Sequence, residues 1–281
     1  MPLAGVHTIR YLNRVVHFYT LPSLDPVPLG IVKPIRHVVA FAVDHEHLKR
    51  PPPSISGPVP VEGVNFSIIK RTGIAMYTMR ERLSFIKEIP LPQGASIARR
   101  IGHSLCIADK ENYNVVDLEG AALFPIIPVS QAQDSSIPVK PSITVVGENE
   151  YLILSWTGGS TIGLFITREG DPVRGTLEWP SHPEAVCLDY PYVTALLPNG
   201  TIEIHSIETQ SIVQVISPPP SSSPPSSPPP SVQQAVRPRS RLNLISSLSG
   251  YLVPSTQQSD KLRKTKVRLL RVPEPSLPVP T

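Results

Sequence analysis

The stretch EAVCLDYPYVTALLPNGTIEIHS, residues 184–206, decides the fold class of this chain. Two β-rich runs within it, residues 192–197 and 201–206, flank the pair Asn199-Gly200. An Asn-Gly pair adopts positive φ at both central turn positions at little cost, and such a turn twists in the same sense as paired strands. We therefore predict a β-hairpin in which Asn199 and Gly200 both have positive φ.

Residues of opposite polarity alternate along the second strand of this hairpin. Ile202 and Ile204 fall on one face, and Glu203 and His205 fall on the other. This alternation is typical of a strand with one buried and one solvated face, so we expect His205 to be an exposed strand histidine. A triad of His205 with the neighbouring residues Ser206 and Asp189 is not supported, because the chain contains no G-x-S-x-G nucleophile elbow.

The same pattern of short strands continues upstream. Residues 150–156 and 161–166 are predicted to form a second hairpin around Gly158-Gly159-Ser160. The connections between such strands are too short for a parallel crossover, so the sheets must be antiparallel meanders. Further strands are predicted at residues 15–20, 37–43, 65–70, 73–78, 83–89, 104–108, 112–117, 121–124, 142–146 and 176–179.

The number of predicted strands sets the architecture. About 16 strands before residue 217, at four per blade, give about four blades of a partial β-propeller in an all-β chain. Residues 1–216 form these blades, and residues 217–260 are predicted to be a disordered, basic insert rich in Pro and Ser. Residues 261–281 are predicted to contain a returning strand at 264–271 and a frayed C-terminus.

Composition limits the classes of function. The chain has 281 residues and a formal charge of +4, but the part from Arg237 onward carries +7 and the preceding part −3. We therefore expect no nucleic acid partner for the folded part. Two cysteines, Cys106 and Cys187, form no disulfide framework or zinc motif, and no apolar run is long enough for a membrane span. These features predict a chain that is cytoplasmic or peripherally associated with a membrane.

Four groups of residues in the sequence are candidate sites. Asp44-His45-Glu46-His47 is the densest set of metal-ligand types, but it is better explained as a polar turn after a buried strand. The glycines of residues 147–163 lack G-x-G-x-x-G and a following helix, so they predict no dinucleotide site. The sequons at Asn65 and Asn199 have no role in a cytosolic chain. The last group could supply a basic patch but is better explained as solvated turn residues: Lys70, Arg71, Arg99 and Arg100.

The basic C-terminal tail is a candidate for contact with acidic lipid head groups, weighed against a solvated disordered insert. Nothing in the sequence assembles an active site. We predict no enzyme activity, no catalytic, cofactor-binding or metal-binding residues, no cofactor and no small-molecule substrate.

Five motifs in order carry a resemblance to a known family. They are NYNVVDL (112–118), GLFITREGDP (163–172), LEW (177–179), YPYVTAL (190–196) and TIEIHSIET (201–209). This series resembles the citron homology domain, in the version found in fungal vacuolar sorting proteins similar to the TGF-beta receptor-associated protein and to the Vam6-type subunit. The resemblance covers about residues 15–216 and 264–271, and it suggests a partial chain.

The resemblance implies a function without catalysis. In this family the domain is a β-propeller used as a protein-interaction platform in CORVET or HOPS tethering subunits, which capture endosomal or vacuolar membranes through Rab GTPases. The expected partners are therefore a Rab-type small GTPase and other tethering-complex subunits. An alternative with the same fold is the regulatory domain of a Rho guanine-nucleotide exchange factor or Ste20-type kinase that binds small GTPases. A β-propeller hydrolase is a further rival.

Overall fold

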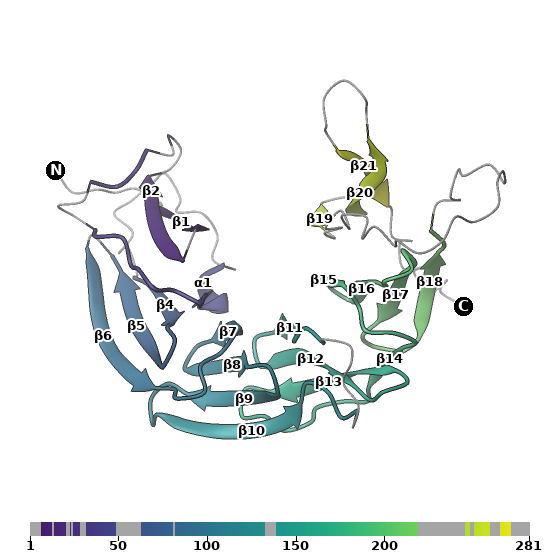
Figure 1. Cartoon of the computed structure of the whole chain (residues 1–281), viewed down its shortest axis with the longest axis horizontal. Coiled ribbons are helices and arrows are strands. Elements are labelled where there is room, and N and C mark those ends of the chain that lie inside the picture. Colours follow the sequence, from purple (N-terminus) through teal and green to yellow (C-terminus); the bar gives the residue numbers. More distant parts are fainter. Residues whose placement is uncertain are drawn as a thin grey trace, which may run out of the picture. The chain divides into compact units, whose positions relative to one another are not determined.

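The protein is an all-β chain, seen in a computed structural model (Figure 1). The structure describes residues 7–12, 14–20, 23, 25–28, 32–48, 63–80, 82–132, 139–218, 245–247, 250–258 and 265–270. Strands dominate these ranges, and α1 (His45–Leu48) is their only α-helix. Within the same ranges, no helix has the length and apolarity to cross a bilayer.

Four sheets of four antiparallel strands follow one another along the chain. In each sheet the strands lie in sequence order, as the short polar connections predicted. The first sheet contains β3 (Ala40–Val43), β4 (Val64–Ile69), β5 (Gly73–Met79) and β6 (Leu83–Pro90). The second contains β7 (Ile97–Ile101), β8 (Ser104–Ala108), β9 (Asn112–Asp117) and β10 (Ala122–Pro128). The third contains β11 (Ile143–Gly147), β12 (Glu150–Trp156), β13 (Thr161–Thr167) and β14 (Leu177–Trp179). The fourth contains β15 (Ala185–Asp189), β16 (Tyr192–Leu196), β17 (Ile202–Ser206) and β18 (Ile212–Ile216).

Two smaller sheets complete the described elements. A hairpin of β1 (His7–Leu12) and β2 (Val15–Thr20) precedes the first large sheet. A three-stranded sheet of β19 (Ile245–Ser247), β20 (Gly250–Gln258) and β21 (Thr265–Leu270) follows the fourth. β21 lies where the sequence predicted a returning strand.

The chain divides into two compact units, residues 1–178 and 179–281. In the first unit, the opening strand β7 contacts both β3 and β11, so the first strands of three consecutive sheets lie together. The middle strands β8 and β9 are almost wholly buried, whereas the outer strands β6 and β10 are largely exposed. This gradient from a shared inner strand to an exposed outer strand is the arrangement of propeller blades.

Apolar side chains fill the spaces between these sheets. One cluster joins Ile69 and Ile74 of the first sheet to Leu105 of the second. Another joins Tyr113 of the second sheet to Tyr151 of the third. Burial raises the pKa of both tyrosine hydroxyls above the ordinary value, and each donates a hydrogen bond to a backbone carbonyl. The packing of neighbouring sheets therefore stabilises the unit, since no single sheet has two covered faces by itself.

The second unit repeats the pattern in one sheet. β16 and β17 are buried, and β18 is mostly exposed. β17 corrects the sequence prediction, because Glu203 and His205 are as buried as Ile202 and Ile204. Alternation of polarity predicted a solvated face, but a central strand of a sheet packed on both sides has none.

The hairpin around Asn199-Gly200 forms as predicted, but its turn differs. Only Gly200 has positive φ, at 84°, and Asn199 does not. The N–H of Gly200 donates to the carbonyl of Leu197 at 2.9 Å, which places Pro198 and Asn199 at the two central positions. Because proline fixes φ near −65°, the turn starts as a right-handed one and Gly200 alone takes the left-handed conformation.

Two strands lie in the segment that the sequence predicted as an insert. Strands β19 and β20 lie within residues 217–260, the segment predicted to be disordered. Residues 219–244 lie outside the described residues, so the insert stays a prediction there.

Candidate interaction surface

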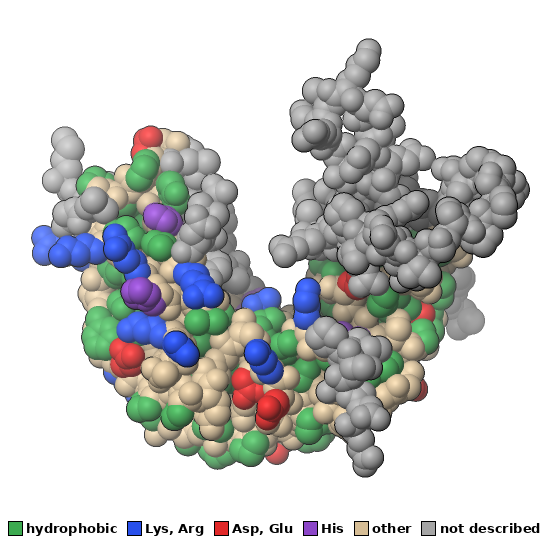
Figure 2. All heavy atoms as spheres, in the orientation of Figure 1, with side chains coloured by type: hydrophobic (Ala, Val, Ile, Leu, Met, Phe, Trp, Pro, Cys, Tyr) green, Lys and Arg blue, Asp and Glu red, His purple; other side chains and the backbone are tan. Residues whose placement is uncertain are grey.

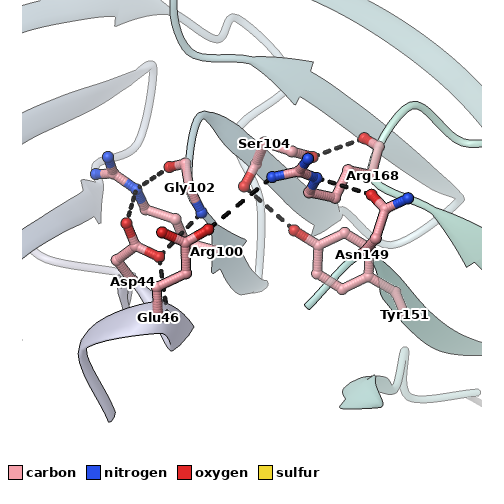
Figure 3. Close-up of polar contacts among 8 residues, drawn as sticks. All are labelled: Asp44, Glu46, Arg100, Gly102, Ser104, Asn149, Tyr151 and Arg168. Atoms are coloured by element: carbon pink, nitrogen blue, oxygen red, sulfur yellow. Dashed lines mark hydrogen bonds and ion pairs between the residues drawn. The ribbon is translucent and has the colours of Figure 1, made fainter. Parts of the chain in front are cut away.

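A polar network begins at Asp44, directly after β3. Its Oδ1 accepts hydrogen bonds from the N–H of Glu46 at 3.3 Å and from the N–H of Gly102 at 2.9 Å. The first bond caps α1, because a helix start leaves backbone N–H groups without partners. The second bond joins the first sheet to the turn between β7 and β8 in the second sheet (Figure 3). Asp44 thus lies at a joint between two sheets, where the sequence analysis expected a polar turn.

Arg100 of β7 supplies the positive charge at this joint. Its side chain is buried, and its Nε donates to the carbonyl of Gly102 at 2.8 Å and lies 4.0 Å from Asp44 Oδ2. A further bond runs from the guanidinium to Ser67 Oγ at 3.2 Å. Burial lowers the pKa of Arg100 below its ordinary value, and the charge of Asp44 opposes this shift. The interpretation of Arg100 as a solvated turn residue was wrong, since its charge is paired and buried.

The network continues into the third sheet through Ser104 and Arg168. Ser104 Oγ donates to the carbonyl of Arg168 at 2.7 Å, and the Tyr151 hydroxyl donates to the carbonyl of Ser104 at 3.2 Å. Arg168 Nε donates to Asn149 Oδ1 at 2.7 Å, and its guanidinium lies 4.0 Å from Glu46 Oε1 (Figure 3). Turns from three consecutive sheets are therefore tied together at one end of the first unit.

This network is structural in character. The carboxylate of Asp44 is already engaged by two N–H groups, and the nearest charge is that of Arg100. In the ranges that the structure covers, no three His, Cys, Asp or Glu side chains gather as metal ligands. His45 and His47 lie on α1, which the sequence pattern did not predict.

A second feature of the first unit is an apolar rim on its outer strands. On β6, Phe85 is 56% exposed and Ile86 is 48% exposed; on the neighbouring β10, Leu123 is 41% and Phe124 is 49% exposed. Lys87 Nζ of β6 donates to the carbonyl of Glu119 at 2.9 Å, which connects β6 to the turn between β9 and β10. We call Phe85, Ile86, Leu123 and Phe124 the apolar rim. Figure 2 shows hydrophobic side chains along the edge formed by these strands.

The apolar rim is unusual for a solvated edge. Both β6 and β10 have one sheet neighbour only, so their outer edges carry backbone groups that pair with no strand in the described part of the chain. Large apolar side chains beside an open strand edge are typical of a surface that another polypeptide covers. The outer strand of the second unit has the same character, with Ile212, Val213 and Val215 exposed.

The second unit holds a buried polar cluster that the sequence analysis missed. The rings of His205 and Trp179 stack with centroids 5.0 Å apart, and His205 Nε2 lies 3.3 Å from Glu203 Oε2. Burial lowers the pKa of His205 to about 4 and raises the pKa of Glu203. The prediction of an exposed histidine was wrong. Ser206 is also buried, and Asp189 is an exposed residue at the end of β15. The Ser206 hydroxyl is therefore not an exposed nucleophile, and a triad of Ser206, His205 and Asp189 is not supported.

These features define a blade-built, all-β domain with structural polar joints and exposed outer strands. The chain belongs to the CNH domain family, whose model matches residues 33–224. The family predicted from five motifs in the sequence is therefore confirmed.

Curated relatives sharpen the placement within the family. The chain is 25% identical over 202 residues to the transforming growth factor-beta receptor-associated protein 1 homolog of Danio rerio, covering 69% of this chain and 21% of the relative. It is 30% identical over 123 residues to vacuolar protein sorting-associated protein 3 of Schizosaccharomyces pombe, covering 43% of this chain and 13% of the relative. The chain thus spans about a fifth of the length of the first relatives it matches.

A solved structure supports the fold. The AfRom2 CNH domain superposes with a TM-score of 0.55 at 19% identity, covering 95% of this chain and 78% of that chain. At this identity the likeness concerns the fold alone.

Proposed function

We propose that this chain is a non-enzymatic protein-interaction module of a membrane-tethering subunit. In this proposal it acts at endosomal or vacuolar membranes in vesicle-mediated transport and fusion, and it binds a Rab-type small GTPase and other tethering-complex subunits. The two relatives described above support the assignment, since one bears a vacuolar sorting name and the other a receptor-association name. Membrane association in this account is peripheral and passes through these partners.

The observation that carries the proposal is the apolar rim. Four large apolar side chains on the outer strands of two consecutive sheets are exposed to solvent, and a hydrogen bond joins β6 to the β9–β10 turn. Burying each of these side chains against a partner would contribute about 1 to 2 kcal/mol to the free energy of binding. The four together are enough to stabilise a protein–protein interface. The rigid support comes from the network of Asp44, Arg100 and Ser104, which ties the three sheets together.

The rival function is a regulatory domain of an exchange factor or kinase with the same fold. The similarity to the solved CNH domain does not favour this rival, because that similarity concerns the fold alone. Sequence similarity to vacuolar sorting-associated protein 3 supports tethering instead.

Cross-linking mass spectrometry on the full chain in cells distinguishes the tethering function from the regulatory-domain function. We expect cross-links from lysines beside the rim, above all Lys87, to other tethering subunits and a Rab-type GTPase. Cross-links confined to a kinase or exchange-factor polypeptide would overturn the tethering assignment.

A further inference from the structure

A groove with a basic edge lies on the first sheet, and one of its lining residues, Tyr77, meets Phe85 of the apolar rim edge-on, with ring centroids 5.6 Å apart. Residues 32–39 lie against β2: the N–H of Ile35 donates to the carbonyl of Val16 at 3.3 Å, and the N–H of Val38 donates to that of Arg14 at 3.1 Å. Between this segment and the first sheet is a depression of about 550 Å³. A second depression of about 530 Å³ extends to the β8–β9 turn, and Lys70 lines both.

Basic side chains line the two depressions. We define the basic groove by six residues: Lys33, Arg36, His37, Lys70, Arg71 and Lys110. Figure 2 shows Lys and Arg side chains gathered on this part of the first unit. Lys70 is ion-paired with Glu88 at 3.0 Å. In the part of the chain that the structure describes, Lys33, Arg36, Arg71 and Lys110 make no ion pair, so four cationic groups can pair with an acidic partner.

The floor of the groove is apolar. Ile35, Tyr77 and Leu83 line the first depression, and Val39 and Ala95 line the second. An apolar floor between basic walls fits an extended chain that carries acidic and apolar side chains together.

The local backbone shapes this groove. Gly94 has φ of 66°, and a Cβ there would lie 2.8 Å from the carbonyl oxygen of Arg71, so only glycine allows the loop to pack this closely. The N–H of Leu91 donates to the carbonyl of Thr72 at 2.9 Å, which fixes the loop against the β4–β5 turn. His37 has φ of 61°, a conformation rare for residues other than glycine and often found at binding sites.

The charges also distinguish between partners. Asp109 and Glu111 line the same depression as Arg71 and Lys110. A planar anionic membrane laid over this surface would meet those carboxylates and be repelled, whereas a peptide can place its acidic residues beside Arg36 and a neutral or basic residue beside Asp109. A segment of a protein therefore fits better than a lipid surface.

We propose that the basic groove binds an extended, acidic peptide segment of a protein partner. The basic groove shares no residue with the apolar rim, although the two surfaces adjoin where Tyr77 contacts Phe85, and the proposal does not depend on the identity of any GTPase. Its test uses the full chain and no GTPase, so its failure would leave the tethering proposal untouched.

The test is fluorescence anisotropy with a labelled Glu-rich peptide containing interspersed apolar residues, and with its counterpart carrying Gln for every Glu. The double variant Lys33→Glu/Arg36→Glu reverses two groove charges. Its matched control is Lys266→Glu/Arg268→Glu, which reverses two charges on β21 of the second unit, at residues that line neither depression. Thermal unfolding of each variant checks that the fold is intact.

We expect the Glu-rich peptide to bind with an affinity that falls with salt, and the Gln counterpart not to bind. The groove variant should weaken binding by about tenfold or more, and the control by less than about threefold. Equal losses in both variants, or no binding of the Glu-rich peptide, would overturn the proposal. So would capture of the chain by phosphatidylserine or phosphoinositide vesicles that the peptide does not displace, because the groove would then serve a membrane.

Discussion

The carboxylate of Asp44 accepts a hydrogen bond from the backbone N–H of Gly102, across 58 residues of sequence and from one sheet to the next. The same carboxylate is the counter-charge of buried Arg100, whose guanidinium also holds the carbonyl of Gly102 at 2.8 Å. This polar contact between residues far apart in the sequence therefore fixes how the first two sheets pack against each other. Both the groove and the rim depend on that packing.

Replacing Asp44 should be strongly destabilising. Asp44→Ala removes the helix cap and the acceptor for the N–H of Gly102, and it leaves the charge of Arg100 buried without its partner, so the free energy of unfolding should fall by about 2 to 4 kcal/mol. Denaturant titration measures this. Asp44→Asn keeps an acceptor and should lose less, and Glu46→Gln, at an exposed residue, should change little. A loss under about 0.5 kcal/mol for Asp44→Ala would show that the joint does not stabilise the fold.

A side chain at Gly102 should lower the stability, chiefly because of the positive φ of this residue. Its φ is 57°, and a Cβ would lie 3.4 Å from the Arg168 guanidinium and from Glu46 Oε1. Gly102→Ala should therefore lower the free energy of unfolding by about 1 to 2 kcal/mol. Gly159→Ala is the matched control, because a Cβ at Gly159 meets nothing within 4 Å. Equal stability of the two variants would contradict the conformational argument.

Acidification should destabilise the second unit through His205. Burial lowers the pKa of His205 to about 4, whereas the unfolded chain binds the proton near 6.5. Between these values the unfolded state carries more protons, so stability is full above about pH 6.5 and falls as pH drops toward 4. Glu203 acts in the opposite direction, because its raised pKa lets the folded state take up a proton first.

The measurement is thermal unfolding across this pH range in the wild type and two variants. His205→Gln should remove the loss of stability between about pH 6.5 and 4, and His103→Gln, at an exposed histidine, should retain it. An unchanged pH slope in His205→Gln would show that His205 does not titrate in this manner.

Local sequence pattern was enough for the sheets. β8, β9 and β12 have the predicted bounds, because their apolar runs end in turn residues that no sheet interior accepts. β7 was missed because Arg99-Arg100 looked like a solvated pair. Only β7 brings Arg100 beside Asp44, far upstream in the chain, so its burial follows from tertiary contact and not from local composition.

The candidate surfaces were less predictable than the fold. The burial of His205 depends on Trp179, and the apolar rim depends on which strand of each sheet is outermost. Neither property can be read from alternation along one strand. A clearer signal was available on β10, where LFPII carries several apolar residues in a row and too many for a strand with one solvated face.

The central claim is that the apolar rim engages a Rab-type GTPase, and its most direct test is binding of the purified full chain to such a GTPase loaded with GTP or GDP. We expect binding that prefers the GTP form. The double variant Ile86→Ser/Phe124→Ser should weaken it by about tenfold or more, and Val173→Ser, at an exposed residue away from the rim, should not. Undiminished binding by the rim variant, or no binding of any Rab-type GTPase in either nucleotide state, would contradict the account.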